Sequence, residues 1–348
     1  LHELFPTAPV YVAFADPHAM GAHWQRFAGW DIRQSWLTRL PGYKKLFSPY
    51  RVFAPQFFSQ FDLSEYDLVI SSSNAYFAKA VKVPNGKHIC YCHTPPRALY
   101  GYSTLSDWQR KPVIGLLGKL LNHYLRVVDY QIAQKVDVFV ANSEETRRRI
   151  AKFYRRDALV IHPPVDVSIE QPQRLSTTQH EVGYYVYVNR LALAKHPEMA
   201  VEACAKRRLP LKVVGQGKML PQLKQLAARY QAQTIEFLGG VSDEELHELY
   251  SGARALLYPV EDEDFGMVPV EAMGHGVPVI AHASGGPLET VIDGQTGILF
   301  DELSTSGLLA AIERFEKLHF SPISIHGFAQ QFNKQQFQRK ILQLVEGN

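Results

Sequence analysis

Residues 253–281, ARALLYPVEDEDFGMVPVEAMGHGVPVIA, decide the fold, because they predict a strand, an acidic loop, a helix and a second strand. Apolar runs stand at both ends, Ala253–Tyr258 and Val277–Ala281, and Gly274-His-Gly276 breaks the helix between them. Inside this unit, Glu263–Glu271 (EDFGMVPVE) places two carboxylates around a Phe-Gly turn and a helix amino end. That arrangement favours a nucleotide sugar, with one glutamate for the sugar and one for the ribose.

The turn itself predicts binding through the backbone. Pro269 falls in the first turn of the helix, where its missing N–H costs nothing. The N–H groups of Gly266 and Met267 would then face hydroxyl or phosphate oxygens, and Gly266 permits a close backbone approach. A plain helix after the acidic loop 261–264 is the alternative interpretation, and the flanking strands favour the binding site.

Short apolar runs alternate with helical patterns along the whole chain. The predicted strands are 66–71, 88–92, 136–141 and 159–162 in the first half, and 184–189, 211–214, 235–238, 253–258, 277–281 and 297–300 in the second. Continuous β-rich runs separated by helices indicate parallel sheets covered on both faces. The sequence therefore predicts an α/β, doubly wound architecture that is present twice.

The segment Pro163–Val182 (PPVDVSIEQPQRLSTTQHEV) lacks periodicity and is rich in Pro, Gln, Ser and Thr, as a domain boundary would be. We predict a first domain over residues 1–165 and a second over 183–325. Residues 326–348 are predicted to form a C-terminal helix that packs back toward the first domain, with its amphipathic pattern running from Gly327 to Leu344. The opening residues 1–6 resemble the end of a helix more than the start of a domain.

The composition, 46% hydrophobic and 20% charged over 348 residues, is that of a soluble globular protein with two domains. Three cysteines, Cys90, Cys92 and Cys204, make no disulfide framework, so we expect a reducing cytoplasm. No nucleic-acid module or zinc-ligand spacing is recognised, and nucleic-acid binding is not expected.

Charge is unevenly distributed. Residues 1–165 carry 21 Lys and Arg against 12 Asp and Glu, whereas residues 166–348 carry 16 against 22. This favours an anionic partner for the first half, such as lipid headgroups or a phosphorylated acceptor, with scattered surface charge as the alternative. The segment Lys44–Phe58 mixes basic and aromatic residues, which is typical of an interfacial membrane segment but also of a half-buried loop.

Further candidate residues stand at the ends of predicted strands. Arg190 and Lys195 follow the first strand of the second half, where open α/β sheets bind ligands, and two cations there could neutralise a diphosphate. His93 and Arg97 lie in a proline-rich loop after a strand of the first half. Asn142 occupies a similar strand end, although the neighbouring Ser143 reads mainly as a helix N-cap.

Two glycine turns are ambiguous. Val214–Gly217 follows a strand but lacks the full dinucleotide-binding spacing. Ser284–Pro287 precedes a helix and suits a phosphate or sugar contact as well as it suits a tight turn.

Together these motifs resemble the retaining GT-B glycosyltransferases of family 4, the glycosyl transferase group 1 family. The resemblance covers nearly the whole chain and rests on His93–Arg97 (HTPPR), Ala141–Ser143, Arg190–Lys195, Phe237–Glu245 (FLGGVSDEE) and Glu263–Glu271 followed by Gly285-Gly286. The HTPPR variant is most similar to bacterial mannosyltransferases of lipopolysaccharide or exopolysaccharide synthesis.

The resemblance implies two Rossmann-like domains facing across a cleft, with acceptor binding in the first and the donor held by the second. It implies that Arg190 and Lys195 bind the diphosphate of a donor, with GDP-mannose favoured. Glu263 would hold the sugar together with the backbone from Phe265 through Gly266 and Met267 to Val268, and Glu271 would bind the ribose.

On the same template His93 contacts the transferring sugar, so the implied catalytic set is His93, Arg190, Lys195 and Glu263. Arg97 and Asn142 would lie toward a lipid-linked or oligosaccharide acceptor. The family generally transfers with retention, by same-face attack, and without a metal or other cofactor. We therefore expect a cytoplasmic hexosyltransferase, peripheral at the inner face of the membrane.

The sequence departs from the family in two places. The family's first strand and its Gly-Gly loop do not precede Leu1, so we expect the first domain to lack its first strand. Gly240 stands where relatives often carry a basic residue, which leaves the base of the nucleotide open. A UDP-hexose donor, a truncated non-catalytic scaffold subunit and a sugar-nucleotide epimerase are the alternatives.

Overall fold

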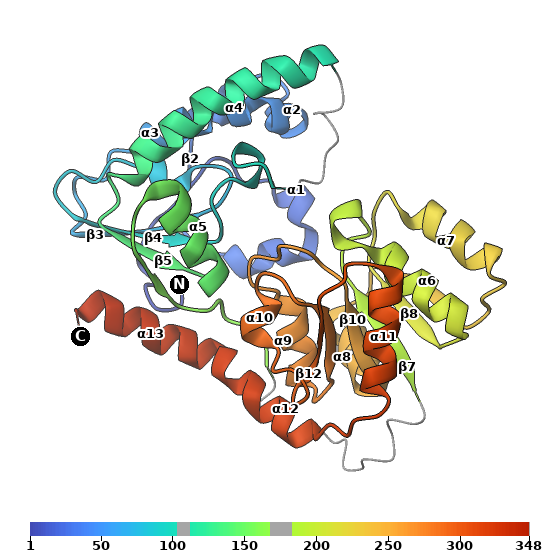
Figure 1. Ribbon diagram of the computed structural model, residues 1–348. Helices are drawn as coiled ribbons and strands as arrows, with labels where there is room; N and C mark the ends of the chain where they lie inside the picture. The colour runs from blue at the N-terminus through green and yellow to red at the C-terminus, as the bar shows by residue number, and fades with distance from the viewer. Residues whose placement is uncertain (103–111, 168–182, 348) are drawn as a thin grey trace. The chain divides into compact units, whose positions relative to one another are not determined.

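The computed structural model describes residues 1–102, 112–167 and 183–347. The chain divides into two compact units, of which unit 1 comprises Leu1–Ile161 with the last residues from Leu342, and unit 2 comprises His162–Ile341. Both are built on parallel strands (Figure 1). Most of the predicted boundary segment Pro163–Val182 lies outside the described residues.

Within the described residues, unit 2 contains a six-stranded parallel sheet in the order β12-β11-β10-β7-β8-β9. Its strands are β7 (Tyr184–Val188), β8 (Leu211–Val214), β9 (Ile235–Gly239), β10 (Ala253–Tyr258), β11 (Val279–His282) and β12 (Gly297–Phe300). Each was predicted from an apolar run, with small shifts at the ends. Side chains on both faces of the central strands β7, β10 and β11 are mostly buried, which explains why these segments are mainly apolar and not alternating.

Helices cover this sheet in two groups whose members contact each other, α6 with α7 and α11, and α9 with α10 and α12. The helices are α6 (Pro197–Arg207), α7 (Leu220–Arg229), α8 (Asp243–Gly252), α9 (Met267–Gly274), α10 (Pro287–Thr290), α11 (Thr305–Phe315) and α12 (Pro322–Ala329). The α/β prediction is thereby confirmed for unit 2.

The prediction of one helix over 326–348 is wrong. Helix α12 ends at Ala329, a 3₁₀ turn covers Gln330–Phe332, and α13 begins afresh over Lys334–Glu346. Asn333 causes the break, because it is extended and its Oδ1 accepts the N–H of Gln336 at 2.9 Å, which caps the new helix. Phe332, buried in the core of unit 2, holds this turn in place.

Unit 1 contains, among its described residues, a four-stranded parallel sheet in the order β3-β4-β5-β6. The strands are β3 (Leu68–Ser73), β4 (Lys87–Cys92), β5 (Val138–Ala141) and β6 (Ala158–Val160), and all were predicted. Two further strands that pair with each other, β1 (Val10–Val12) and β2 (Ile32–Gln34), were missed. Each has three residues and no buried residue, so neither shows a periodic apolar pattern.

The helices of unit 1 are α1 (Pro17–Met20), α2 (Tyr43–Tyr50), α3 (Ala54–Ser59), α4 (Pro112–Ala133) and α5 (Glu144–Tyr154), with short 3₁₀ turns η1 (Gly21–Phe27), η2 (Trp36–Arg39), η3 (Arg51–Phe53), η4 (Ala78–Ala80) and η5 (Arg97–Leu99). The basic and aromatic segment Lys44–Phe58 is not one interfacial element. Its end forms α3, which buries Phe57 and Phe58 in the core beside Leu37, whereas Phe53 is exposed.

A buried ion pair lies between α4 and η4 of unit 1. Lys79 Nζ contacts Asp129 Oδ1 at 2.5 Å, and both side chains are almost fully buried. The hydroxyls of Tyr100 and Tyr154 donate to Asp129 Oδ2 at 2.9 and 2.8 Å. Burial disfavours the charged form of Lys79, but the charge and hydrogen bond of Asp129 together with Cys92 and Cys90 outweigh this and raise the pKa of the amine. The carboxylate is thus fully satisfied, as a structural charge should be.

We predict that Asp129→Ala lowers the free energy of unfolding by about 3–5 kcal/mol, because it leaves a buried ammonium without its partner. Urea denaturation followed by circular dichroism measures the change. Asp31→Ala is the matched control, since the Arg33–Asp31 pair of the same unit is exposed and such pairs contribute about 0–1 kcal/mol. Equal losses in the two variants would contradict the structural role of Asp129.

Candidate donor site

The predicted donor residues of unit 2 gather where the strand order of its sheet reverses. After β7 the chain continues to β8 on one side, whereas after β10 it continues to β11 on the other. β7 and β10 are neighbours, so Arg190 and Glu263 both follow strands that flank this point. Ligands of open parallel sheets bind at such a switch point, beyond the carboxyl ends of the strands.

Lys195 and Glu263 meet at this edge. The Lys195 ammonium forms an ion pair with Glu263 Oε2, and the two side chains are 20% and 17% exposed. The hydroxyl of Tyr187, a residue of β7, donates to the backbone carbonyl of Lys195 at 2.8 Å and positions its turn. The structure thus brings together the cation expected for the diphosphate and the carboxylate expected for the sugar.

Arg190 is at the same edge but is not part of that pair. Its side chain is exposed and makes no hydrogen bond or ion pair with the described residues, while its N–H donates to Asn189 Oδ1 at 2.9 Å. Neighbouring glycines pack closely here: a Cβ at Gly215 would lie 1.9 Å from the Asn189 carbonyl oxygen. The Val214–Gly217 turn therefore supports the backbone that carries Arg190.

The loop that carries Glu263 is held by the second ambiguous glycine turn. Gly286 N–H donates to the Glu263 carbonyl at 2.9 Å, and Asp262 N–H donates to Ser284 Oγ at 2.9 Å. A Cβ at Gly286 would come within 1.9 Å of the Phe265 carbonyl oxygen, and one at Gly285 within 2.2 Å of the Glu263 carbonyl oxygen. The structure favours support of the loop as the role of this turn.

Between the two glutamates, Phe265 and Gly266 differ in what they can offer a ligand. The Phe265 ring is buried against His162 and Phe332, with ring centroids 5.4 and 5.6 Å apart, so only its backbone can face a ligand. Gly266 adopts φ +84° at the N-cap of α9, a conformation that favours glycine. No side chain caps the helix there, so the first N–H groups of α9 can bind a ligand.

The next residues of α9 follow the prediction. Met267 is 46% exposed and Val268 is half-buried, so both start the helix at the surface. Pro269 lies in the first turn, as predicted, where it removes no intrahelical hydrogen bond.

Glu271 is a half-buried carboxylate one turn further along α9. Burial raises its pKa first, and the carboxylates of Asp243 and Asp166 raise it further. The Tyr250 hydroxyl lies beside the Glu271 carboxylate and lowers its pKa, although less than burial raises it. A carboxylate offers several acceptor positions, so Glu271 at this place suits a pair of ligand hydroxyls.

Three histidines at the carboxyl end of α9 were missed by the sequence analysis. His275 Nδ1 lies 2.8 Å from the Glu271 carbonyl oxygen and His326 Nδ1 lies 2.7 Å from that of Gly274, so each ring can donate to the helix end. His247 Nδ1 lies 2.6 Å from His275 Nε2. Burial lowers the pKa of His275, which favours the neutral ring in this chain. The only sequence signal was His275 within the helix breaker.

In unit 1, His93 and Asn142 follow the paired strands β4 and β5 and share one edge of the sheet. His93 Nε2 hydrogen-bonds Ser72 Oγ at 2.8 Å, a partner that the sequence analysis did not identify. Asn142 is buried, and its Oδ1 accepts from Ser143 Oγ at 3.0 Å. Ser143 caps α5 through Thr146 N–H, as predicted. Arg97 begins η5 in the loop after His93.

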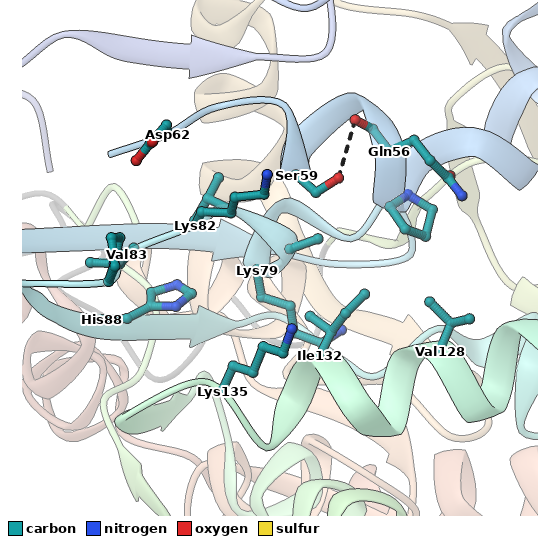
Figure 2. Close-up of a pocket in the computed structure, with 14 residues that line it drawn as sticks. Gln56, Ser59, Asp62, Lys79, Lys82, Val83, His88, Val128, Ile132 and Lys135 are labelled. Carbon is teal, nitrogen blue, oxygen red and sulfur yellow. Dashed lines mark hydrogen bonds between the residues drawn. The ribbon is translucent and has the colours of Figure 1, made fainter. Parts of the chain in front are cut away.

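A cavity of about 510 Å³ in unit 1 is lined by Lys79, Lys82, Lys135 and His88, among others (Figure 2). It lies beside His88, near the start of β4, whereas His93 follows the end of that strand. His88 Nε2 bonds Ser71 Oγ at 2.9 Å, and burial lowers the pKa of its ring to about 4. The cavity is therefore away from the carboxyl ends of the strands, where open α/β sheets bind ligands.

The described residues contain no group of three or more His, Cys, Asp or Glu side chains placed to hold a metal ion. No helix within the described ranges has the length and apolar character needed to cross a membrane.

Curated proteins similar to this chain are glycosyltransferases. Alpha-1,3/1,6-mannosyltransferase ALG2 of Kluyveromyces lactis is 28% identical over 66% of this chain and 53% of its own length. A GDP-mannose-dependent alpha-(1-6)-phosphatidylinositol monomannoside mannosyltransferase of Mycolicibacterium smegmatis is 29% identical over 52% of this chain and 53% of its own length. The chain spans about half the length of the curated relatives it matches.

Solved structures and family models agree on the fold. A sucrose-phosphate synthase of Thermosynechococcus elongatus superposes with a TM-score of 0.67 at 20% identity, covering 98% of this chain and 96% of that one. The lipopolysaccharide outer core galactosyltransferase WaaB gives 0.62 at 18% identity, with 92% and 85% covered. The Glycosyltransferase Family 4 model matches residues 10–169, and the Glycosyl transferases group 1 model matches residues 170–344. The chain therefore belongs to the glycosyl transferases group 1, family 4, and has the GT-B fold of two Rossmann-like domains.

Proposed function

We propose that this protein is a retaining hexosyltransferase that moves mannose from GDP-mannose to a lipid-linked or polysaccharide acceptor in lipopolysaccharide or exopolysaccharide synthesis. The observation that carries the proposal is the Lys195–Glu263 pair at the switch point, with the half-buried Glu271 carboxylate on the next helix. Two relatives that are mannosyltransferases by name support the choice of sugar. The reaction would need no metal or other cofactor.

In this proposal the donor lies along α9. Lys195 and Arg190 neutralise the diphosphate, Glu263 holds the sugar, and the backbone from Phe265 to Val268 contacts sugar and phosphate oxygens. Glu271 accepts hydrogen bonds from the ribose hydroxyls. The ion pair with Glu263 keeps the Lys195 side chain oriented, which limits the entropy lost when the diphosphate binds.

The chemical step would exchange one C–O bond for another on the same face of the sugar. The acceptor oxygen bonds to the anomeric carbon while the bond from that carbon to the diphosphate oxygen breaks. The acceptor proton passes to the departing diphosphate, whose negative charge Lys195 and Arg190 stabilise. His93 would contact the transferring sugar, with Arg97 and Asn142 toward the acceptor. The enzyme would work in the cytoplasm at the inner face of the membrane.

Isothermal titration calorimetry with GDP-mannose, GDP, UDP-glucose and UDP-galactose tests the donor. We expect binding of GDP-mannose and GDP and much weaker binding of the UDP-sugars. Preferential binding of a UDP-sugar would show that the donor is a UDP-hexose and not GDP-mannose. No binding to any of the four compounds would contradict the donor site. Turnover of the donor without an acceptor would instead indicate an epimerase.

We predict that Glu271→Gln lowers GDP affinity about tenfold, since a neutral amide replaces a charged acceptor of two hydroxyls. The carboxylate is the binding form and its pKa lies above the ordinary value of 4.5. Wild-type affinity should therefore fall as the pH is lowered through this raised pKa, and the variant should lose that part of the pH dependence. Glu248→Gln, an exposed change on α8, is the control. Equal losses of GDP affinity in both variants would show that Glu271 does not bind the nucleotide.

Lys195→Ala should reduce the transfer rate by roughly 10²–10³-fold, because it removes a cation that stabilises the leaving diphosphate. GDP affinity should change less, since Arg190 and the helix amino end still meet the phosphates. Single-turnover transfer and calorimetry separate the two effects, with the exposed Lys224→Ala on α7 as the control. If affinity and rate fall together by the same factor, Lys195 only binds the donor.

A further inference from the structure

Helix α4 is the long helix of unit 1 (Figure 1), and its described side chains, from residue 118 onward, are apolar on two opposite faces. Its inner face packs into the core through Leu125 and Ala133, which are buried. Its outer face carries Leu120, Tyr124 and Val127, whose side chains are 64%, 56% and 46% exposed. Spacings of four and three residues put these three on one face of the helix.

Packing of the core does not require apolar side chains on the outer face of α4. A helix on the surface of a globular protein normally has one apolar stripe toward the core and polar residues opposite it. Here Leu121 and Tyr130, 40% and 38% exposed, extend the apolar surface around the outer stripe. Contiguous exposed apolar surface of this kind marks an interaction site.

The charges around the stripe indicate what covers it. Lys119, His123 and Arg126 are exposed on one flank, and Arg126 contacts His123. Asp129 is the only acidic residue of α4, and it is buried in the pair with Lys79. The outer face of α4 therefore combines apolar side chains with cations and no carboxylate, in a half of the chain with 21 basic against 12 acidic residues.

We propose that the outer face of α4, defined by Leu120, Leu121, Tyr124, Val127 and Tyr130, docks on an anionic phospholipid bilayer. The apolar side chains enter the boundary between headgroups and acyl chains, while Lys119 and Arg126 meet lipid phosphates. The inference rests on the proposed function in one respect, that a lipid-linked acceptor is reached at a bilayer. A second copy of the chain fits less well, because a two-fold interface would bring the same cations together.

Cosedimentation with vesicles of phosphatidylglycerol and phosphatidylcholine tests the proposal. Wild-type protein should bind these vesicles and bind pure phosphatidylcholine vesicles less. Leu120→Glu with Tyr124→Glu should lower the partition coefficient about tenfold or more, since it places two carboxylates in the apolar face. Lys119→Ala with Arg126→Ala should weaken binding and make it less sensitive to salt.

Leu159→Glu is the matched control, because Leu159 is 52% exposed on β6 of the same unit and the new charge is the same. An equal loss of vesicle binding in this variant would overturn the proposal. A wild-type protein that does not bind anionic vesicles would overturn it as well. A dimer in light scattering that Leu120→Glu dissociates, without vesicle binding, would assign the face to a second copy instead.

Calorimetry with GDP-mannose on the same variants separates this inference from the proposed function. Unchanged donor affinity in the Leu120→Glu, Tyr124→Glu variant would show that lost vesicle binding is not lost folding, and would support the docking face. Vesicle binding by a wild-type protein that binds no nucleotide sugar would support docking and contradict the donor assignment alone.

Discussion

The candidate donor site depends on the close approach of two backbone segments, Gly285-Gly286 and the loop from Glu263 to Phe265. A side chain at Gly286 would overlap the Phe265 carbonyl, and the Gly286 N–H already donates to the Glu263 carbonyl. Because this contact leaves no room for a Cβ, it sets where the loop after β10 ends and where α9 begins. The direction of the helix amino end, and with it the position of Glu263 beside Lys195, follows from that contact.

The buried carboxylate of Asp129 and the half-buried carboxylate of Glu271 have different surroundings. Asp129 has an ammonium and two tyrosine hydroxyls around it, so nothing remains for a ligand to satisfy. Burial and the carboxylates of Asp243 and Asp166 raise the pKa of Glu271 more than His247 and the Tyr250 hydroxyl lower it. Keeping the Glu271 carboxylate charged in these surroundings costs free energy in the absence of a ligand, and hydrogen bonds from ligand hydroxyls would offset that cost.

Much of the fold could be predicted because buried parallel strands are apolar along most of their length, as at β7 and β12. The strands β1 and β2 gave no such signal, since they are short and partly exposed. Strand ends located Arg190, Glu263 and His93 without a structure, because topology alone places them at a sheet edge. The resemblance placed Lys195 and Glu263 in one donor site with different roles, but their direct ion pair was not predicted, because only three-dimensional packing brings the two side chains into contact.

The sequence analysis did not identify the three histidines, His247, His275 and His326, that lie at the carboxyl end of α9. His326 comes from α12 and His247 from α8, so no local pattern connects them with α9. The rings of His275 and His326 meet carbonyl oxygens at the carboxyl end and His247 contacts the His275 ring, whereas no side chain of the described residues caps the amino end at Gly266. The protein thus supplies partners at the carboxyl end of this helix, while the N–H groups and the dipole at its amino end suit a negative ligand of the kind proposed above.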